Sequence, residues 1–276
     1  MEKGRRGRMT VWICAAVLLA ALAVWIYLGN VTVGVSEYIV ADGDIPQAFD
    51  GFRIAQISDL HNAGLAGLIP ALEAARPDII VVTGDLIDSR HTDVRTAVDA
   101  IKKAAALAPV YYVAGNHESR LHDEYAVLET GLLGLGVHVL HDAAETLTIG
   151  GQSITLAGLD DPDFRRAKDR AAPDIAALTA GAGYTVLLSH RPELLLEYSA
   201  SGANLVFAGH AHGGQFRIPF IGGVFAPGQG FFPKYDAGRF ELGGTVMIVS
   251  RGLGNSLFPF RVNNAPELVV AELCIK

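Results

Sequence analysis

Short apolar runs, each ended by polar residues, constrain the fold of this 276-residue chain more than any other feature. Seven such runs follow residue 50, and each is four to seven residues long. They cover residues 52–58, 79–83, 110–114, 153–157, 185–189, 205–208 and 245–250. Compact runs of this length are typical of buried strands. Before them, the alternation of Val31, Val33 and Val35 with polar or small residues predicts a half-buried strand.

Stretches with helical spacing, rich in Ala, Leu and Glu, lie between several of these runs. They cover residues 65–76, 92–107, 124–135 and 193–199. Buried strands that alternate with amphipathic helices indicate an α/β protein, with central β-sheets flanked by helices on both faces. Because no repeat or low-complexity linker interrupts residues 31–276, we predict one domain there.

The N-terminus carries a different pattern, an unbroken run of 18 uncharged and mostly apolar residues at positions 11–28. As a helix rising about 1.5 Å per residue, it would span roughly 27 Å, close to the thickness of a bilayer core. The two tryptophans of the chain, Trp12 and Trp25, lie near its ends, where interfacial aromatic residues are expected. We therefore predict a cytoplasmic stub and a transmembrane anchor over residues 1–30.

A cleaved signal peptide and a buried helix of a soluble protein are the alternatives to an anchor. The apolar region of a signal peptide is usually 7–15 residues long and is followed by a small-x-small cleavage site, which residues 26–30 do not provide. Arg5-Arg6 occurs as in a twin-arginine signal, but its neighbours do not extend that pattern. Because the basic residues precede the run, we expect a single-pass cell-membrane protein with its domain on the extracytoplasmic side.

The net charge of −7 is unevenly divided, with +3 on residues 1–30 and −10 on residues 31–276. An acidic domain argues against general nucleic-acid binding, which needs a basic face. With only Cys14 and Cys274 present, a multi-bridge disulfide framework and a four-cysteine zinc site are both excluded. Histidines and carboxylates must therefore hold any metal.

Polar residues able to bind metal follow five of the seven apolar runs. They are Asp59-Leu60-His61, Gly84-Asp85-Leu86-Ile87-Asp88, Gly115-Asn116-His117-Glu118, His190, and Gly209-His210-Ala211-His212. An open α/β sheet places its ligand crevice at the carboxyl ends of its strands. Carboxylates and imidazoles from separate strand ends can converge on divalent cations. The sequence therefore predicts a metal site at the C-terminal ends of the strands.

The local spacing supports this prediction. Side chains two residues apart in an extended segment point the same way, so Asp59 and His61 are expected on one side of their loop. A single Asp-x-His pair is typical of any polar loop, and an isolated buried histidine is usually a hydrogen-bonded core residue. Five of the nine histidines nevertheless fall in these strand-end loops, and that combination favours metal binding.

Five motifs follow one another over about residues 52–214: D-x-H, G-D-x-x-D, G-N-H-E, a lone His and G-H-x-H. In this order they resemble the motifs of the calcineurin-like metallophosphoesterase superfamily. Four segments are further similar to the bacterial membrane-associated, YkuE-like branch of this superfamily: residues 57–61, 158–162, 209–215 and 251–254. The resemblance implies a metallophosphoesterase-type layered fold, with residues 31–276 as the catalytic domain. It also implies a membrane-anchored, metal-dependent phosphohydrolase.

The same resemblance implies that seven side chains hold two divalent ions. Asp59, His61 and His212 would hold one ion, Asn116, His190 and His210 the other, and Asp85 would bridge them. A hydroxide shared by both ions would attack phosphorus and break a phosphoester or pyrophosphate bond. The catalytic residue His117 would stabilise the transition state or protonate the leaving group.

Neighbouring residues receive supporting roles by the same resemblance. Asp88 and Glu118 are expected to orient His117 or the ligand imidazoles, with ordinary turn or cap carboxylates as the alternative. Arg191 and Arg120 lie nearest the motifs, and either would contact a substrate phosphate or form a surface salt bridge. The mixed nitrogen and oxygen donors suit Mn, Zn or Fe better than Ca or Mg.

The substrate class stays open between phosphomonoesters, phosphodiesters and lipid-linked pyrophosphates. Residues 215–236 hold five of the twelve phenylalanines, at positions 216, 220, 225, 231 and 232. They fit a hydrophobic loop folded over the sheet, or an apolar wall that accepts acyl chains or touches the lipid surface.

Other function classes lack their motifs. Neither the G-x-S-x-G of serine hydrolases nor the phosphate-binding G-x-x-x-x-G-K-[ST] and G-x-G-x-x-G occurs in the chain. A catalytically inactive metal-binding envelope protein is the remaining alternative, but the presence of His117 and of every expected ligand favours an enzyme. His91, His122, His138 and His141 lie outside the motifs, and we expect structural or solvent-facing roles for them.

Overall fold

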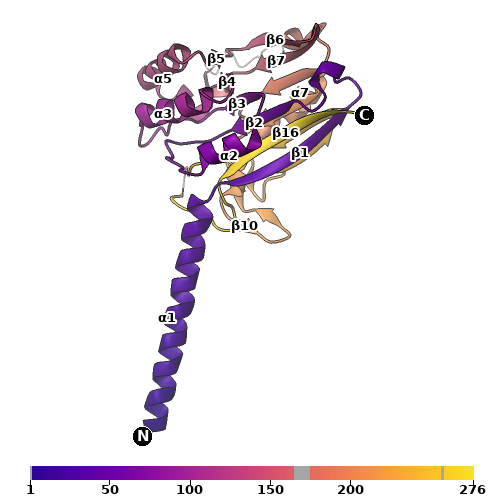
Figure 1. The fold of residues 1–276 in the computed structure, drawn as a ribbon. Helices are drawn as coiled ribbons and strands as arrows, with labels where there is room; N and C mark the ends of the chain where they lie inside the picture. The colour runs from indigo at the N-terminus through magenta and orange to yellow at the C-terminus, as the bar shows by residue number, and fades with distance from the viewer. Residues whose placement is uncertain (1, 165–174, 256–257) are drawn as a thin grey trace.

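A computed structural model describes residues 2–164, 175–255 and 258–276 as one long helix attached to a body of β-sheets and helices (Figure 1). The long helix is α1 (Glu2–Val31), which extends away from the body (Figure 1). Its segment Arg8–Val31 is long and apolar enough to cross a membrane and is not buried in the body. Its large side chains face outward, as Trp12 at 74% exposure illustrates. Helix α1 is therefore not a core helix of the body, which removes one alternative to an anchor.

The first sheet has six strands in the order β1-β16-β2-β3-β4-β5. Their bounds are β1 Gly34–Asp42, β16 Glu267–Ile275, β2 Arg53–Ile57, β3 Ile79–Thr83, β4 Val110–Val113 and β5 His138–Val139. Strands β2 to β5 run parallel, while β16 pairs antiparallel with β2. The carboxyl ends of β2, β3 and β4 therefore lie at one edge of the sheet.

The second sheet has six strands in the order β14-β15-β9-β8-β7-β6. Their bounds are β14 Gly238–Leu242, β15 Thr245–Val249, β9 Leu205–Ala208, β8 Thr185–Leu188, β7 Gln152–Gly158 and β6 Ala143–Ile149. The four central strands are parallel, and β6 and β14 close the edges as antiparallel hairpin partners. The loops that follow β8 and β9 therefore lie at the same edge of the second sheet.

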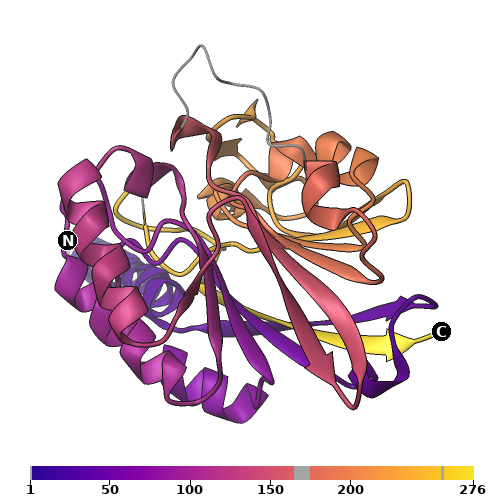
Figure 2. The ribbon, with the colours of Figure 1, turned by 90° about the horizontal axis from the view of Figure 1, so that it is seen from above.

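The inner faces of the two sheets pack against each other, and helices cover the outer faces (Figure 2). Ile54 and Val81 of the first sheet share one buried cluster with Val186 and Phe207 of the second. Successive side chains of a strand point to opposite faces. Leu187, which follows Val186 in β8, therefore packs in a different buried cluster on the outer face of the second sheet.

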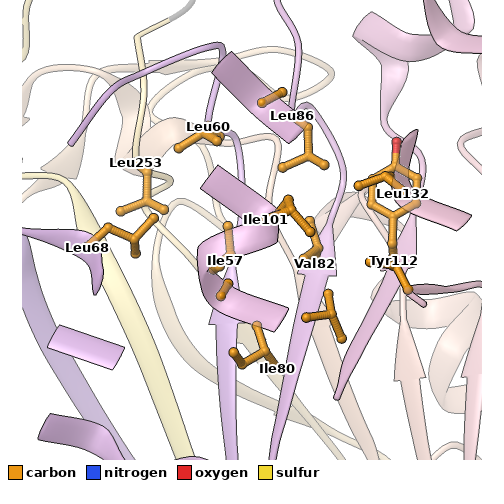
Figure 3. Packing of buried hydrophobic residues seen from close by; sticks show 14 of the residues in the cluster. Ile57, Leu60, Leu68, Ile80, Val82, Leu86, Ile101, Tyr112, Leu132 and Leu253 are labelled. Carbon is orange, nitrogen blue, oxygen red and sulfur yellow. The ribbon is translucent and has the colours of Figure 1, made fainter. Parts of the chain in front are cut away.

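Different helices cover the two outer faces. Those of the first sheet are α2 (Leu68–Ala75), α3 (Val94–Ala105) and α5 (His122–Gly134), and those of the second are α6 (Ile175–Thr179) and α7 (Leu195–Ala200). Figure 3 shows Ile57, Val82 and Ile101 in the cluster between the first sheet and its helices.

Short elements complete the loops of the body. The helices are α4 (Asn116–Ser119) and the 3₁₀ turns η1 (Gln47–Phe49), η2 (Pro162–Phe164), η3 (Pro192–Leu194) and η4 (His212–Gly214). Two small hairpins pair β10 (Arg217–Ile218) with β11 (Gly222–Gly223), and β12 (Phe225–Ala226) with β13 (Gly230–Phe231).

These observations confirm the predicted fold class. The seven apolar runs form β2, β3, β4, β7, β8, β9 and β15, and the four helical stretches contain or overlap α2, α3, α5 and α7. The prediction of helices on both faces is wrong: each sheet carries helices on one face only, because its other face is buried against the other sheet. Strands buried on both faces are apolar at every position, so their sequences do not distinguish a helix from a sheet as the covering layer.

Candidate metal centre

Five loops from the two sheets bring the predicted site residues together at the carboxyl ends of β2, β3, β4, β8 and β9. Ten of these side chains are buried: Asp59, His61, Asp85, Asp88, Asn116, His117, Glu118, His190, His210 and His212. Burying so many polar and ionisable groups is costly unless they are paired or bind a cation. This concentration distinguishes the site from an ordinary polar loop cluster.

One group contains Asp59, His61, Asp85 and His212, whose potential ligand atoms lie within 4.8 Å of one another. The Nε2 atoms of His61 and His212 are 3.1 Å apart. His212 Nε2 is 3.4 Å from Asp59 Oδ1, and His61 Nε2 is 3.6 Å from Asp85 Oδ2. Two imidazoles and two carboxylates therefore face a common point.

A second group contains Asp85, His190 and His210. His190 Nε2 lies 3.3 Å from Asp85 Oδ2, 3.1 Å from His210 Nδ1 and 3.1 Å from Asn116 Oδ1. Asp85 Oδ2 thus faces both groups. This is the position that a carboxylate bridging two cations would need.

The hydrogen bonding of His190 tests whether these residues fit a metal. Its Nδ1 lies 2.7 Å from the Thr83 carbonyl oxygen, which can only accept, so Nδ1 carries a proton. Burial disfavours a charged ring, but Asp85 and Asp59 outweigh it and raise the pKa of His190 to about 10, so Nε2 also carries a proton that faces Asp85. A divalent cation could replace that proton and accept the lone pair of Nε2 together with those of the Asp85 and Asn116 oxygens. The donor set therefore fits a divalent metal ion.

The backbone at the site departs from the extended conformation that we predicted for the Asp-x-His segment. Asp59 and His61 have φ values of 50° and 45°, in the left-handed region, and both still face one point. Asp85, His210 and His212 share this conformation, at φ values of 53°, 65° and 49°. Such backbone costs about 1–3 kcal/mol per residue and tends to cluster at functional sites.

Glycines allow the loops to approach closely. A Cβ on Gly115 would lie 2.3 Å from Asp85 Oδ1, and one on Gly84 would lie 2.6 Å from the Gly115 Cα. Both distances are too short for any side chain, so these two positions require glycine.

Charge interactions tune the buried groups in opposite directions. Burial opposes ionisation of Asp85, but the nearby His190 and His61 outweigh it and hold the pKa of Asp85 well below its usual value. Burial lowers the pKa of His117 to about 4. Burial, with the charge of Asp85, raises the pKa of Glu118 to about 7. Closely spaced groups with divergent pKa values are typical of reactive sites.

Asp88 and Glu118 have different surroundings. Asp88 Oδ2 lies 3.2 Å from His61 Nδ1 and 3.7 Å from His117 Nδ1, so its carboxylate lies beside two imidazoles. The hydrogen bonds of Glu118 instead come from main-chain N–H groups, those of Asp85 and Gly115 at 2.9 and 2.8 Å. Glu118 therefore fixes the backbone of two site loops.

Arg191 forms an ion pair beside the site. Its Nε and Nη2 donate to the carboxylate oxygens of Asp161 at 2.6 and 2.9 Å, and Nη2 lies 3.0 Å from Asp163 Oδ2. Its Nη1 is 3.2 Å from His210 Nε2. These contacts are the salt bridge that the sequence offered as one alternative for Arg191. Arg191 also lies beside His210, so it remains part of the site.

A cavity of about 250 Å³ opens over the two groups. It is lined by Asp85, Arg90, Asn116, His117, Arg120, Arg191, His210, His212, Pro227 and Gly228. Sequence reasoning missed Arg90, although its position two residues after Asp88 was a usable signal. Pro227 and Gly228 belong to the turn between β12 and β13, inside the segment 215–236 that the sequence offered as an apolar wall.

Arg261 is a further residue that the sequence did not reveal. It is only 1% exposed, and its Nη2 lies 3.4 Å from His212 Nδ1. Its Nη1 donates to the Arg251 carbonyl oxygen at 2.7 Å, and Nη2 also contacts the Gly254 carbonyl. The residue stands 49 positions after His212 in no recognisable motif.

The phenylalanine-rich segment forms the two small hairpins and does not fold over the sheet as a whole. Phe220, Phe231 and Phe232 are exposed at 108%, 74% and 62%. Phe216 instead packs with Phe258, their ring centroids 5.2 Å apart. The hydrophobic-loop interpretation therefore holds for Phe216 and fails for the three exposed rings.

The histidines outside the motifs have the structural or solvent-facing surroundings that we expected. His141 pairs with Glu129 and Asp160, at 2.7 and 3.0 Å, and His138 pairs with Glu145 at 2.8 Å. His91 and His122 are exposed.

Comparisons with known proteins agree with this geometry. The family model described as calcineurin-like phosphoesterase matches residues 52–214. The uncharacterized metallophosphoesterase YkuE of Bacillus subtilis is 31% identical, over 90% of this chain and 87% of its own length. The phosphodiesterase YaeI of Escherichia coli is 28% identical, over 80% of this chain and 82% of its own length.

A further relative is named as a transmembrane protein. A transmembrane protein with metallophosphoesterase domain from Danio rerio is 25% identical over 81% of this chain, which covers 53% of that protein. The YkuE-like resemblance is thus confirmed, and the chain belongs to the calcineurin-like phosphoesterase family.

Proposed function

We propose that this protein is a membrane-anchored phosphohydrolase that works with two divalent ions and hydrolyses phosphoester or pyrophosphate bonds. The position of Asp85 carries the proposal, because its Oδ2 lies 3.6 Å from His61 Nε2 and 3.3 Å from His190 Nε2. One carboxylate oxygen facing two ligand groups suits a pair of cations better than a single one. When bound, the ions supply an activated water nucleophile and offset the charge of the phosphoryl oxygens.

The two ligand groups suggest how the residues divide. Asp59, His61 and His212 would hold one ion, Asn116, His190 and His210 the other, with Asp85 shared. Imidazole with carboxylate and amide oxygens suits Mn, Zn or Fe.

His117 is the proposed catalytic residue. Its Nδ1 accepts a hydrogen bond from the Ser89 N–H at 2.9 Å, so the neutral ring carries its proton on Nε2. That Nε2 lies 4.0 Å from Asp85 Oδ2, and the residue lines the cavity. Nε2–H can therefore donate a hydrogen bond to a phosphoryl or leaving-group oxygen and stabilise its growing charge.

The cavity lining favours a substrate with more than one anionic or polar part. Arg90, Arg120 and Arg191 line its wall. Guanidinium groups bind phosphate oxygens well, so they would hold parts of the substrate beyond the reacting phosphorus. Together with the similarity to a protein named phosphodiesterase, this favours phosphodiesters over phosphomonoesters.

Lipid-linked pyrophosphates are a second candidate class. The turn at Pro227 and Gly228 lines the cavity, and the same hairpin carries the exposed Phe231. An acyl chain attached to a phosphate in the cavity would find an apolar surface along this hairpin.

Helix α1 would serve as the anchor and leave the body on the extracytoplasmic side. Lys3, Arg5, Arg6 and Arg8 precede its uncharged run at positions 11–28, and basic residues favour the cytoplasm.

The test compares metal content and turnover of the full chain with those of Asp85→Asn. Mn-loaded protein in detergent would be assayed on bis-p-nitrophenyl phosphate, p-nitrophenyl phosphate and a lipid-linked pyrophosphate. We expect two ions per chain and faster diester cleavage, with both metal content and turnover reduced in Asp85→Asn. Asp99→Asn, at an exposed position of α3, is the matched control.

Two results would count against the proposal. Metal binding without turnover under any metal would favour the inactive metal-binding protein. An unchanged metal content in Asp85→Asn would contradict the shared carboxylate.

A further inference from the structure

Helix α1 and the body are joined at Asn30, beside the end of the apolar segment. The Asn30 side chain donates to the Arg261 carbonyl oxygen at 2.9 Å and accepts from the Arg261 N–H at 2.7 Å. It also donates to the Ile26 carbonyl oxygen at 2.7 Å, within its own helix. The main chain at Arg261 is therefore fixed to the last turn of α1.

The contact extends further down the helix. Trp25, Ile26 and Gly29 line a cavity of about 230 Å³ together with Arg251, Arg261 and residues 263–265. Trp25 belongs to the segment Arg8–Val31 that is apolar enough to cross a membrane. Tryptophan near the end of such a segment is typical of the membrane interface. If α1 spans a bilayer, this part of the body lies at the level of the lipid headgroups.

Exposed apolar side chains lie on the segment that precedes Arg261 and on the β10 hairpin that contacts this segment. We name them the apolar rim: Ile218, Phe220, Ile221, Phe258 and Phe260, exposed at 41%, 108%, 64%, 44% and 43%. The β10 hairpin, whose loop to β11 carries Phe220 and Ile221, lies on the same side of the body as α1 (Figure 1).

The two parts of the rim are physically connected. The Phe216 ring contacts the rings of Phe258 and Phe260, with centroids 5.2 and 5.6 Å apart. The Arg217 N–H donates to the Val262 carbonyl oxygen at 3.0 Å. The hairpin is therefore held to the same segment that contacts α1.

We propose that the apolar rim inserts into the interface of the bilayer that α1 crosses, as a second membrane contact of this protein. The inference rests on the membrane anchoring in the proposed function. Water disfavours five exposed apolar side chains in one region, and aromatic rings are stable at the headgroup boundary. The occupant is a bilayer because the rim is continuous with the joint at the interfacial end of α1.

A second contact has a mechanical consequence. A body attached only through α1 could tilt relative to the membrane surface, whereas a second contact through the rim limits that tilt. The metal-centre cavity would then keep a fixed tilt to the membrane surface.

The test measures depth in the membrane with the full chain in liposomes of phosphatidylcholine and phosphatidylglycerol. Single cysteines carry an environment-sensitive fluorophore, and nitroxide-labelled lipids quench it. The test positions are Phe220→Cys and Ile221→Cys, both exposed, in a background with Cys14→Ser and Cys274→Ser.

Two controls calibrate the signal. Native Cys14, with Cys274→Ser, reports from within α1. Val127→Cys reports from α5, which lies at the far end of the body from α1 (Figure 1). The Val127 side chain is 62% exposed. We expect quenching at positions 220 and 221 to be several-fold stronger than at position 127.

Equal quenching at 220, 221 and 127, with Cys14 strongly quenched, would overturn the second contact and leave anchoring and catalysis untouched. An unquenched Cys14 would overturn the anchoring and the second contact with it. Turnover in the same samples reports separately on the phosphohydrolase proposal.

Discussion

The Glu118 carboxylate accepts a hydrogen bond from the main-chain N–H of Asp85 at 2.9 Å, although the two residues follow different strands. The same oxygen accepts from the Gly115 N–H at 2.8 Å, and the other oxygen accepts from Ile87 at 3.2 Å. One buried side chain thereby fixes the loops after β3 and β4 relative to each other.

Glu118→Gln is expected to weaken metal binding and turnover. Its amide NH₂ would face N–H donors where a carboxylate oxygen now accepts. Loss of such supporting contacts typically costs about 10–100-fold in metal affinity or activity. Mn titration and kcat/KM would measure the effect, with Glu124→Gln, exposed in α5, as the control. Wild-type values in Glu118→Gln would mean that the loops hold their positions without it.

His117→Gln is expected to lower kcat by about 10²–10³-fold, the usual cost of losing one donor to developing charge. Metal content should stay at the wild-type value, because His117 is not among the proposed ligands. The two measurements on one sample separate catalysis from metal loading. Loss of metal in this variant would instead place His117 among the ligands. His122→Gln, exposed in α5, controls for general effects of replacing a histidine.

Removing metal is expected to lower thermal stability. Asp59 and Asp85 are both buried, and without cations their charges rely on neighbouring histidines and on hydrogen bonds such as those from the main-chain N–H groups of His210 and His117. A ligand present at 100 times its Kd stabilises a fold by about 2.7 kcal/mol. At about 2–4 °C per kcal/mol for domains of this size, dialysis against a chelator should lower the Tm by roughly 5–10 °C. The shift should reverse on adding Mn and be smaller in Asp85→Asn.

His141 is expected to give the body a pH-dependent stability. Hydrogen bonds to Asp160 and Glu129 raise its pKa to about 9 in the folded state. A raised histidine pKa stabilises the fold fully below the unfolded pKa, about 6.5, and this stabilisation is lost as the pH rises through about 9. Because the side chain is 42% exposed, the contribution is about 0.5–1 kcal/mol.

Urea unfolding at two pH values would test the His141 contribution. His141→Gln should be less stable than wild type at pH 6 and nearly equal to it at pH 10. His122→Gln, exposed in the same region, should show no such difference. Equal destabilisation at both pH values would indicate lost packing rather than lost charge pairing.

Local patterns predicted much of the fold because the central strands are buried on both faces. Residues 79–83 and 205–208 are apolar runs whose predicted bounds match β3 and β9. Strands β6 and β14 escaped prediction because they lie at sheet edges and alternate exposed polar residues with half-buried ones. The division into two packed sheets depends on pairings between distant segments, which no local pattern specifies.

The site was predictable where the ligand side chain and the turn that positions it belong to one short motif. Asp59, Asp85 and Asn116 each lie two or three residues after the end of a strand, so the geometry of a parallel sheet brings them together. Their ligand roles stay predictions until metal binding is measured. The left-handed backbone at Asp59 was not predictable, because surrounding contacts rather than the residue itself impose it.

Contacts between distant segments set the limit of sequence reasoning. Arg261 meets His212 across 49 positions and Asn30 across 231. Neither pair forms a spacing that a reader of the sequence would test. Buried arginines that fasten loops are therefore visible only in three dimensions.

The division of the metal centre between two sheets has a consequence for when it can be assembled. Each proposed ion takes ligands from both sheets, and His190 lies 74 residues after Asn116. During synthesis, a chain that ends before His210 lacks a complete set for either ion. Neither site can therefore form until β8 and β9 of the second sheet have been made and have packed against the first sheet.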